Sequence, residues 1–289
     1  METGLLFMIK NLTNIACKSF KNTDLRKTQL SIQINLDGFS FCIYNLTSKQ
    51  PIKFQRFEFN NRATTPEQLL NYIKTIYQNN DVLSMSYEKV NVIHQNELAT
   101  LVPNAFFDQK NLKNYIKKSV KVLDIDFLSF DTLASVDATS VYIPFVNVNN
   151  FIFSIHGSFT YFHSFSILIE KLQKEDLKND KDKIFIHVNN TSFEILVFKN
   201  NTLQAINSFE IETSEDFIYY ILFTAEQFDL NTETLDLMLL GDINKESERY
   251  AILYRYIRNI HFYSNTQKRL PKEFQNLTSQ SNFILFNEQ

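Results

Sequence analysis

Apolar and polar residues alternate in two neighbouring stretches of the chain, residues 31–36 and 39–43. This period of two is typical of strands with one buried face. Asp37-Gly38 separates the two stretches, and alternation on both sides of Asp-Gly predicts a β-hairpin with a two-residue turn of type I′. Residues 51–59 alternate in the same way and predict a third strand. The first 30 residues are polar and weakly patterned, so they predict no element.

Helical spacing begins after this third strand. Pro66 follows Thr65, which is the pattern of a helix start, and the apolar residues from 69 to 77 recur every three or four positions. The patterns that follow predict a strand at 88–94, a helix at 108–120, a strand at 139–145 and a helix at about 160–174.

The second part of the chain repeats this order of elements. Its patterns predict strands at 184–188, 192–198 and 202–211, a helix at 213–229, a strand at 234–240, a helix at 246–258 and a short strand at 259–263. A polar tail follows, with one late strand at 283–286. Residues 175–183 are almost wholly charged or polar, which is typical of a boundary. We therefore expect an N-terminal segment at 1–30, a first half at 31–178 and a second half at 179–289.

An internal duplication is visible when the two halves are aligned. At a constant offset of 152 residues, Ile32 meets Ile184 and Phe57 meets Phe209. The same offset places Asp37-Gly38 over Asn189-Asn190. With a further shift of four residues, the helix that starts near Glu67 meets the helix that starts near Glu215. Since the order of elements also matches, we interpret the chain as two copies of one unit, each strand–strand–strand–helix–strand–helix.

Three stretches of the sequence carry a family resemblance: Leu30 to Phe41, Ser140 to Pro144, and Asn207 to Tyr220 followed by Leu240-Gly241. They resemble a bacterial family of unknown function that is assigned to the actin-like ATPase fold, over roughly residues 30–263. That resemblance implies an α/β protein with two ribonuclease-H-like halves around a cleft. A more distant resemblance is to actin-like pilus-assembly and secretion proteins, which bind partner peptides.

The resemblance also implies where a nucleotide would lie. In actin-like ATPases one hairpin from each half holds the phosphates and the metal, and a glycine-rich turn packs on the adenosine. By position, these elements are Asp37-Gly38-Phe39-Ser40, the turn with Asn189 and Thr191, and Gly241. Asp37 would hold Mg²⁺ through water and Ser40 would donate to a phosphate. Each stretch departs from the family pattern: bulky Phe39 follows Gly38, and the second turn has neither glycine nor an acid.

Composition bears directly on this site. The chain has 4 glycines, whereas an average protein of 289 residues would have about 20. Phosphate-binding loops depend on glycine because backbone N–H groups must approach the phosphate oxygens closely. Asp-Gly and Asn-Asn also suit tight structural turns, since Asn tolerates positive φ. The two stretches can therefore be phosphate-binding loops or structural turns. The scarcity of glycine favours a pseudo-ATPase without a cofactor over an enzyme that uses ATP and Mg²⁺.

Other catalytic or metal-binding chemistry has little support in the sequence. His156 and His163 are seven residues apart on or near one predicted helix, which is not a usual metal-ligand spacing. Cys17 and Cys42 have no His–acid pattern around them. Four aspartates between predicted elements are interpreted as a solvated loop: Asp124, Asp126, Asp131 and Asp137. We therefore name neither a catalytic residue nor a metal ligand.

The chain contains 28 Phe and 13 Tyr but no Trp, so Phe and Tyr must supply the aromatic volume of the core. Some of them are candidates for a partner surface, because aromatic residues next to Arg are typical of protein-binding hot spots. Half-buried helix packing is the alternative for these residues. The candidates are Tyr219, Tyr250, Tyr254 and Tyr256, with Arg255 and Arg258 beside them.

The net charge is −3, so no basic surplus calls for nucleic acid or an anionic bilayer, although a local basic patch stays possible. The apolar run near the N-terminus is too short for a signal peptide or a membrane span. We expect a cytoplasmic protein that binds an unidentified protein partner without catalysis. The competing hypothesis is a divergent ATP-dependent enzyme or switch that uses the cleft between the halves.

Overall fold

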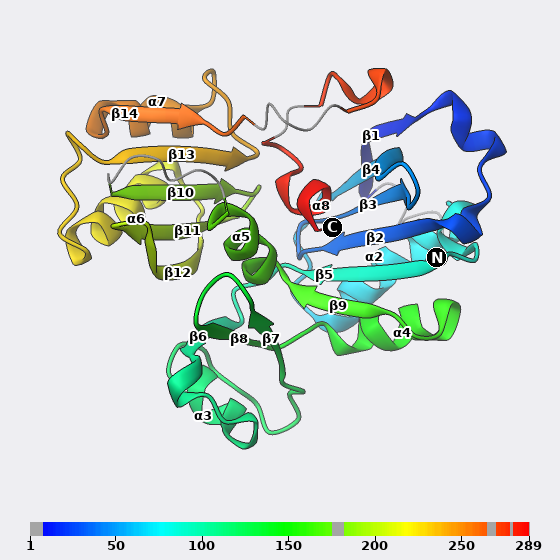
Figure 1. The fold of residues 1–289 in the computed structure, drawn as a ribbon, viewed down its shortest axis with the longest axis horizontal. Helices are drawn as coiled ribbons and strands as arrows, with labels where there is room; N and C mark the ends of the chain where they lie inside the picture. The colour runs from blue at the N-terminus through cyan, green and yellow to red at the C-terminus, as the bar shows by residue number, and fades with distance from the viewer. Residues whose placement is uncertain (1–7, 175–181, 265–269, 278–279, 289) are drawn as a thin grey trace.

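The structure is a computed structural model that describes residues 8–174, 182–264, 270–277 and 280–288. These residues form three β-sheets (Figure 1). The sheet of the first half has the strand order β1-β4-β3-β2-β5-β9, and that of the second half has the order β12-β11-β10-β13-β14. A small third sheet, β6-β8-β7, belongs to a subdomain between β5 and β9.

The first half is built on the predicted hairpin and its third strand. β2 pairs antiparallel with β3 and β3 with β4, while β5 and β9 add parallel strands on the other side. Leu30, Ile32 and Ile34 lie on one face of β2 and are fully buried, as the alternation predicts. The strands of this sheet are β1 (Ile9–Ala16), β2 (Thr28–Ile34), β3 (Gly38–Asn45), β4 (Gln50–Phe59), β5 (Lys89–His94) and β9 (Thr160–His163).

The strand β1 was missed by the sequence patterns. It pairs antiparallel with β4 at the edge of the first sheet. Polar residues such as Asn11 and Asn14 occupy half of it, and its side chains are exposed or half-buried. An edge strand is held chiefly by backbone hydrogen bonds to its one neighbour, so it needs no alternation of apolar residues.

The region between β5 and β9 differs most from the predicted elements. The expected helix at 108–120 is only the short α3 (Leu112–Ile116), and the expected strand at 139–145 is β8 (Ala138–Tyr142). The strands β6 (Ala99–Pro103) and β7 (Ser129–Leu133) and the helix α4 (Val146–His156) were not predicted. The expected helix at 160–174 begins only at Ser164, as α5 (Ser164–Leu172), because residues 160–163 pair with β5 as β9. His156 and His163 are therefore not on one helix, and that prediction is wrong.

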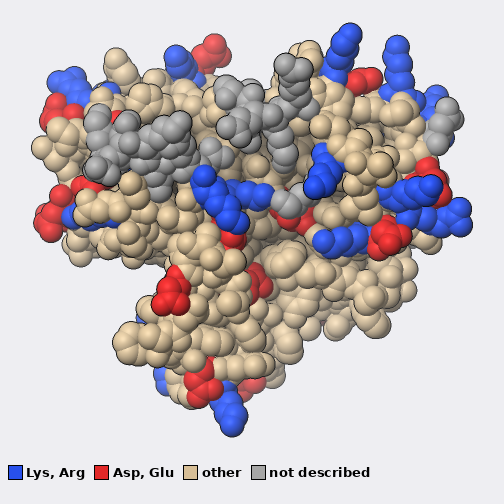
Figure 2. Space-filling model, viewed as in Figure 1, with Lys and Arg blue, Asp and Glu red and all other residues tan. Residues whose placement is uncertain are grey.

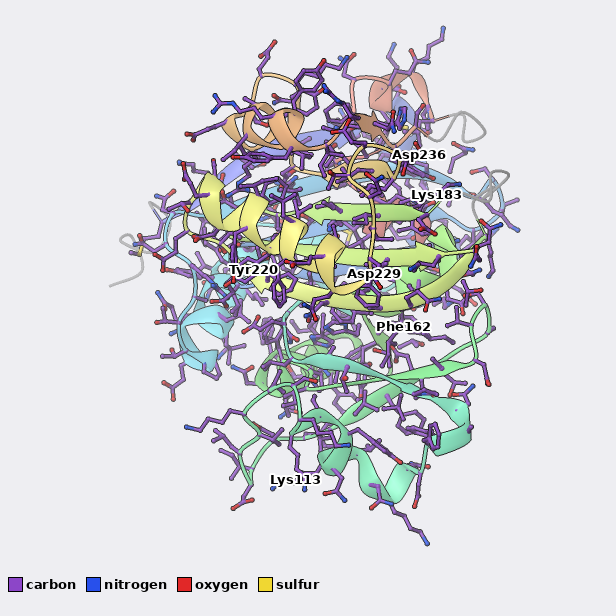
Figure 3. The ribbon with its side chains drawn as sticks, turned by 90° about the vertical axis from the view of Figure 1, so that its left-hand side faces the viewer. Lys113, Phe162, Lys183, Tyr220, Asp229 and Asp236 are labelled. Carbon is purple, nitrogen blue, oxygen red and sulfur yellow. The ribbon has the colours of Figure 1, made fainter. Side chains whose placement is uncertain are left out.

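The second half follows its predicted order closely. Its elements are β10 (Lys183–Val188), β11 (Ser192–Lys199), β12 (Thr202–Glu210), α6 (Ser214–Gln227), β13 (Asp236–Gly241), α7 (Glu248–Tyr256) and β14 (Asn259–Phe262). Figure 3 looks onto this half, with the helix that carries Tyr220 across the sheet. The helix α2 (Pro66–Gln78) and α6 have the same kind of N-terminus, since Thr65 and Thr213 each accept a hydrogen bond from the third helical N–H.

The two hairpins are related by an offset of 154 residues, not 152. The last pair of the first hairpin is Ile34 with Phe39, and that of the second is Val188 with Phe193. Asp37 is therefore equivalent to Thr191, and the predicted superposition of Asp37-Gly38 on Asn189-Asn190 is wrong by two residues. A slip of two residues keeps every side chain on the same face of a strand, so the hydrophobic pattern does not distinguish the two registers.

The late strand expected at 283–286 is a helix, α8 (Phe283–Asn287). It lies against β2 and β3 of the first half, and the Tyr44 hydroxyl donates to the carbonyl oxygen of Leu285 at 3.1 Å. Together with α5 it belongs to one apolar cluster that contains residues of both large sheets, such as Phe54 and Phe185. The layer of α5 and α8 thus joins the two halves (Figure 1).

The predicted boundary at 175–183 lies mostly outside the described residues. Of this stretch the structure describes Asp182 and Lys183, and β10 begins at Lys183. The assignment of residues 1–30, 31–178 and 179–289 to separate units stays a prediction. Two observations bear on it: β1 pairs within the first sheet, and α8 near the end of the chain lies on the first sheet.

Candidate functional site

The turns that join the first two strands of each half meet between the halves. Asp37 lies in the turn after β2, and its Oδ2 accepts hydrogen bonds from the hydroxyl of Thr191 at 2.7 Å and from its N–H at 3.3 Å. Beside them, the amide nitrogen of Asn190 donates to Glu58 Oε1 at 3.0 Å. Two of the predicted site residues, Asp37 and Thr191, are therefore each other's hydrogen-bond partners.

The turns differ in conformation from the expected type I′. That turn requires positive φ at both central residues, and among the described residues neither Gly38 nor Asn189 and Asn190 have it. Gly38 is instead the first residue of β3, where a Cβ would lie 2.5 Å from the carbonyl oxygen of Phe57. Positive φ occurs at Asn200 and Asn201, in the turn between β11 and β12.

Two arginines connect the halves next to these turns. Arg56 on β4 forms a two-pronged ion pair with Asp242, which follows β13, and Arg62 pairs with Glu210 at the end of β12. Burial alone would lower the pKa of Arg56, but the hydrogen bonds and charge of Asp242 outweigh it, so its pKa lies above the usual value. The guanidinium therefore stays charged. Arg56 was not among the candidate residues, and Asp242, which directly follows Gly241 in the predicted adenosine turn, had been given no role.

Gly241 is constrained by the neighbouring strand β10. Its φ is +78°, and a Cβ at this position would lie 2.1 Å from the carbonyl oxygen of Val188. The N–H of Gly241 donates to the carbonyl oxygen of Gln280 at 2.9 Å, which holds the C-terminal segment against the second half. Glycine is therefore required here for close packing of backbone on backbone.

A pocket of about 300 Å³ lies between the halves at this place. Five of the six predicted cofactor-binding residues line it, while Thr191 lines a smaller pocket on the other side of the turn. The ionised groups around the larger pocket are three carboxylates and two guanidiniums, and Arg249 also donates to the carbonyl oxygens of Asn189 and Asn190. The five predicted residues that line the larger pocket are Asp37, Gly38, Ser40, Asn189 and Gly241. The charged residues that line it are Asp37, Glu58, Asp242, Arg56 and Arg249.

A buried polar network extends from this pocket into the protein. Glu194 on β11 is 1% exposed and accepts from Gln95 Nε2 at 2.7 Å, His187 Nδ1 at 2.9 Å and Asn189 Nδ2 at 3.0 Å. Gln95 follows β5 in the first half, so the network crosses between the halves. The sequence analysis did not single out Glu194 or Gln95. A signal exists in hindsight: Glu194 is an acid inside an otherwise apolar strand.

Two further histidines are fully buried. Burial lowers the pKa of His94 to about 3, and burial together with His94 lowers the pKa of His163 to about 3. His94 is bonded to Asn149 and His163 to Asn96, so both imidazoles are neutral and satisfied. Across the part of the chain that the structure describes, no group of three or more His, Cys, Asp or Glu side chains could hold a metal ion.

One of the four aspartates is not in a solvated loop, contrary to prediction. Asp131 lies on β7 and accepts from Tyr142, Ser166 and the N–H of His163. Burial raises its pKa despite these hydrogen bonds. The cluster joins the small subdomain to α5 and therefore has a structural role.

The predicted partner surface divides into exposed and packed residues. Tyr254 is 65% exposed on α7 and Tyr219 is 60% exposed on α6, where its ring stacks on Phe223. Tyr256 is also exposed. Tyr250 is half-buried between Tyr254 and Phe262, as the packing alternative predicts. Arg255 is exposed and Arg258 pairs with Glu233.

Comparison with known proteins identifies the family. The model of a family described as protein of unknown function (DUF3822) matches residues 17–260. The chain belongs to this family. No curated protein matches it. The family resemblance seen in the sequence is confirmed, and the family description names no activity.

Solved structures show that this DUF3822 protein has the actin-like ATPase fold. A Bacteroides thetaiotaomicron protein with an actin-like ATPase fold and unknown function matches with a TM-score of 0.76 at 21% identity, over 86% of this chain and 94% of that chain. The PilM–PilN complex of type IV pilus biogenesis matches with a TM-score of 0.50 at 11% identity, over 90% of this chain and 97% of that chain. Within the described ranges, no helix is long and apolar enough to cross a membrane.

Proposed function

We propose that this protein is a cytoplasmic, non-catalytic member of the actin-like fold that acts by binding another protein. The observation that carries the proposal is the direct contact between the two turns. Asp37 is bonded to Thr191, and Arg56 is paired with Asp242. Asp37 and Thr191, two of the residues that the resemblance implies for the nucleotide site, are thus already bonded to each other, which supports a pseudo-ATPase.

The charges in the pocket support the same conclusion. A triphosphate needs several N–H donors and cations, whereas carboxylates outnumber guanidiniums here and none of the described lysines lines the pocket. Gly38 and Gly241 are both explained by close approaches to a neighbouring strand. A structure of the same fold is a complex of two pilus-biogenesis proteins, which supports binding of a protein rather than turnover of a nucleotide.

A second candidate function is nucleotide binding, as a divergent ATP-dependent enzyme or switch. It is favoured by the pocket itself, which five of the six predicted residues line. Its volume of about 300 Å³ is at the lower end of the range of about 300–1,000 Å³ for small-molecule sites. In this case Asp37 would exchange Thr191 for hydrated Mg²⁺, and Ser40 would donate to a phosphate.

Isothermal titration calorimetry with ATP and Mg²⁺ separates the two functions. We expect no binding heat at millimolar ATP, for a protein that circular dichroism shows to be folded. Micromolar binding that Asp37→Ala abolishes would overturn the proposal and favour the second candidate. Asp81→Ala is the matched control, because Asp81 is an exposed aspartate outside the pocket.

The protein-binding part of the proposal is tested with the aromatic surface of α7. We expect affinity capture from the protein's own cells to retain a partner that Tyr254→Asp loses, since Tyr254 is the most exposed of the four tyrosines. Phe153→Asp on α4 is the control, because Phe153 is similarly exposed on another element. If wild type and Tyr254→Asp retain the same proteins, the surface assignment fails.

A further inference from the structure

The small subdomain carries a long connection that crosses one face of its sheet. β6 and β7 both pair antiparallel with β8, so they run parallel to each other and need a crossover between them. Residues 104–128, here called the crossover segment, make this connection. Its inner side contributes Ile116 to an apolar cluster with Val102 and Val141 of the sheet. The subdomain projects from the body of the molecule, at the bottom of Figure 1.

The outer side of the crossover segment exposes large apolar side chains. Ile125 is 89% exposed and Phe106 is 74% exposed, and Leu123 and Phe127 are each about half exposed. Single exposed apolar residues are normal on a protein surface, but four in one segment of a small subdomain mark an interaction site. All four are exposed among the described residues, and they belong to the subdomain that projects from the body of the molecule (Figure 1).

Two contacts join the parts of the segment that carry these residues to α3. The Tyr115 hydroxyl on α3 donates to the carbonyl oxygen of Phe106 at 2.6 Å. Lys113 on the same short helix pairs with Asp124 at 2.6 Å, which fixes the turn that carries Ile125. Figure 3 places Lys113 at the far end of the subdomain.

The same segment has a local excess of positive charge. It contains five exposed lysines against three aspartates, although the whole chain has a net charge of −3. The aspartates accept local hydrogen bonds: Asp124 from Lys113, Asp108 from the N–H of Lys110, and Asp126 from the N–H of Leu123. The lysines are Lys110, Lys113, Lys117, Lys118 and Lys121.

We propose that the crossover segment binds the surface of a bilayer that contains anionic lipid. Exposed lysines attract the anionic headgroups, and the apolar side chains between them enter the interface between headgroups and acyl chains. The high exposure of these side chains favours a bilayer, because a flat, soft surface accepts separate projecting side chains without a complementary pocket. Figure 2 shows acidic and basic side chains both on the projecting subdomain and on the rest of the face in view.

Vesicle sedimentation of the full chain tests the proposal. We expect at least fivefold more protein to sediment with vesicles of phosphatidylcholine and phosphatidylglycerol than with phosphatidylcholine alone. Ile125→Asp and Lys117→Glu should each remove most of this binding, whereas Phe153→Asp should leave it unchanged. Equal sedimentation with both vesicles, or full binding by the Ile125 variant, would overturn the proposal and leave an acidic protein as the partner to seek.

Tryptophan fluorescence gives an independent readout, because the chain contains no Trp. Ile125→Trp places a single reporter at the most exposed apolar position, and Phe153→Trp places one on α4 as a control. We expect a blue shift of emission from the first reporter and none from the second when anionic vesicles are added. The absence of a shift from the Ile125 reporter would also overturn the proposal.

Discussion

Glu194 is the acceptor that holds the buried network between the halves together, and Glu194→Ala tests that role. The variant removes an acceptor shared by three donors: Gln95 Nε2, His187 Nδ1 and Asn189 Nδ2, which bond to Glu194 at 2.7, 2.9 and 3.0 Å. Gln95 and Asn189 each keep a longer hydrogen bond, to Asn189 Oδ1 at 3.1 Å and to Ser192 Oγ at 3.5 Å. The loss of a buried acceptor costs about 1–3 kcal/mol per donor, so the three bonds together cost about 3–5 kcal/mol.

We therefore expect Glu194→Ala to lower the free energy of unfolding by about 3–5 kcal/mol. For a chain of this size about 1 kcal/mol corresponds to roughly 2–4 °C in Tm, so Tm should fall by about 10 °C. Glu194→Gln keeps the volume and one acceptor, and it should cost about half as much. Differential scanning calorimetry measures both changes.

Glu226→Ala is the matched control, because Glu226 is an exposed acid on α6 whose side chain faces solvent. Its Tm should stay at the wild-type value. A Glu194→Ala variant that also melts within about 2 °C of wild type would refute the reasoning, since 2 °C corresponds to less than about 1 kcal/mol. The network would then be bonded to water or rearranged instead of holding the halves together.

Three further predictions concern stability. Gly241→Ala should destabilise the protein by clearly more than Gly157→Ala in chemical denaturation. Both residues have positive φ, which alone costs an added side chain about 1–3 kcal/mol, but only Gly241 has a backbone oxygen at 2.1 Å from the added Cβ. Equal losses of stability in the two variants would contradict the close approach. His94 and His163 have pKa values of about 3 in the folded protein, against 6.5 for an unperturbed imidazole, so the stability they contribute is complete above pH 6.5 and is lost as pH falls towards 3. At pH 5 each of these two histidines should lower the free energy of unfolding by about 2 kcal/mol relative to neutral pH. A denaturation midpoint in urea that does not change between pH 7.5 and 5 would be inconsistent with neutral buried imidazoles. Glu288→Ala removes the carboxylate that accepts from Ser31 at 2.6 Å and from two buried amides; it should cost about 1.5–3 kcal/mol and speed amide hydrogen exchange in α8, and unchanged exchange there would exclude an anchoring role.

Most of the residues singled out for the candidate site lie near one another, but their bonding was not predicted. The residues singled out in the two turns and at Gly241 do lie together, because equivalent turns of duplicated units face each other across the cleft. The pairing of Asp37 with Thr191 and of Arg56 with Asp242 was not predictable. These partners are about 150 and 190 residues apart in sequence, and no local pattern reports which side chains meet at such distances.

Elements with a strong local pattern were predicted well, and short apolar runs were not. The hairpins, the third strands and the helices with a Thr cap follow from alternation, helical spacing and capping, which depend on near neighbours in the chain. Residues 160–163 precede the apolar helical pattern directly, and residues 283–286 are a short apolar run; both stretches are too short for their pattern to distinguish a strand from a helix. The first became a strand because β5 offered an open edge, and the second became a helix because it fills the space between the first sheet and α5.

The sequence by itself predicted two duplicated α/β halves and most of their elements, because these depend on periodic patterns among near neighbours in the chain. The actin-like fold followed from the family resemblance. Only the tertiary structure decided the hairpin register, the place of α8, the buried network around Glu194 and the closure of the two turns onto each other. The physical reason is that a two-residue register slip keeps the hydrophobic face, and a polar side chain finds its partner only after distant segments have packed.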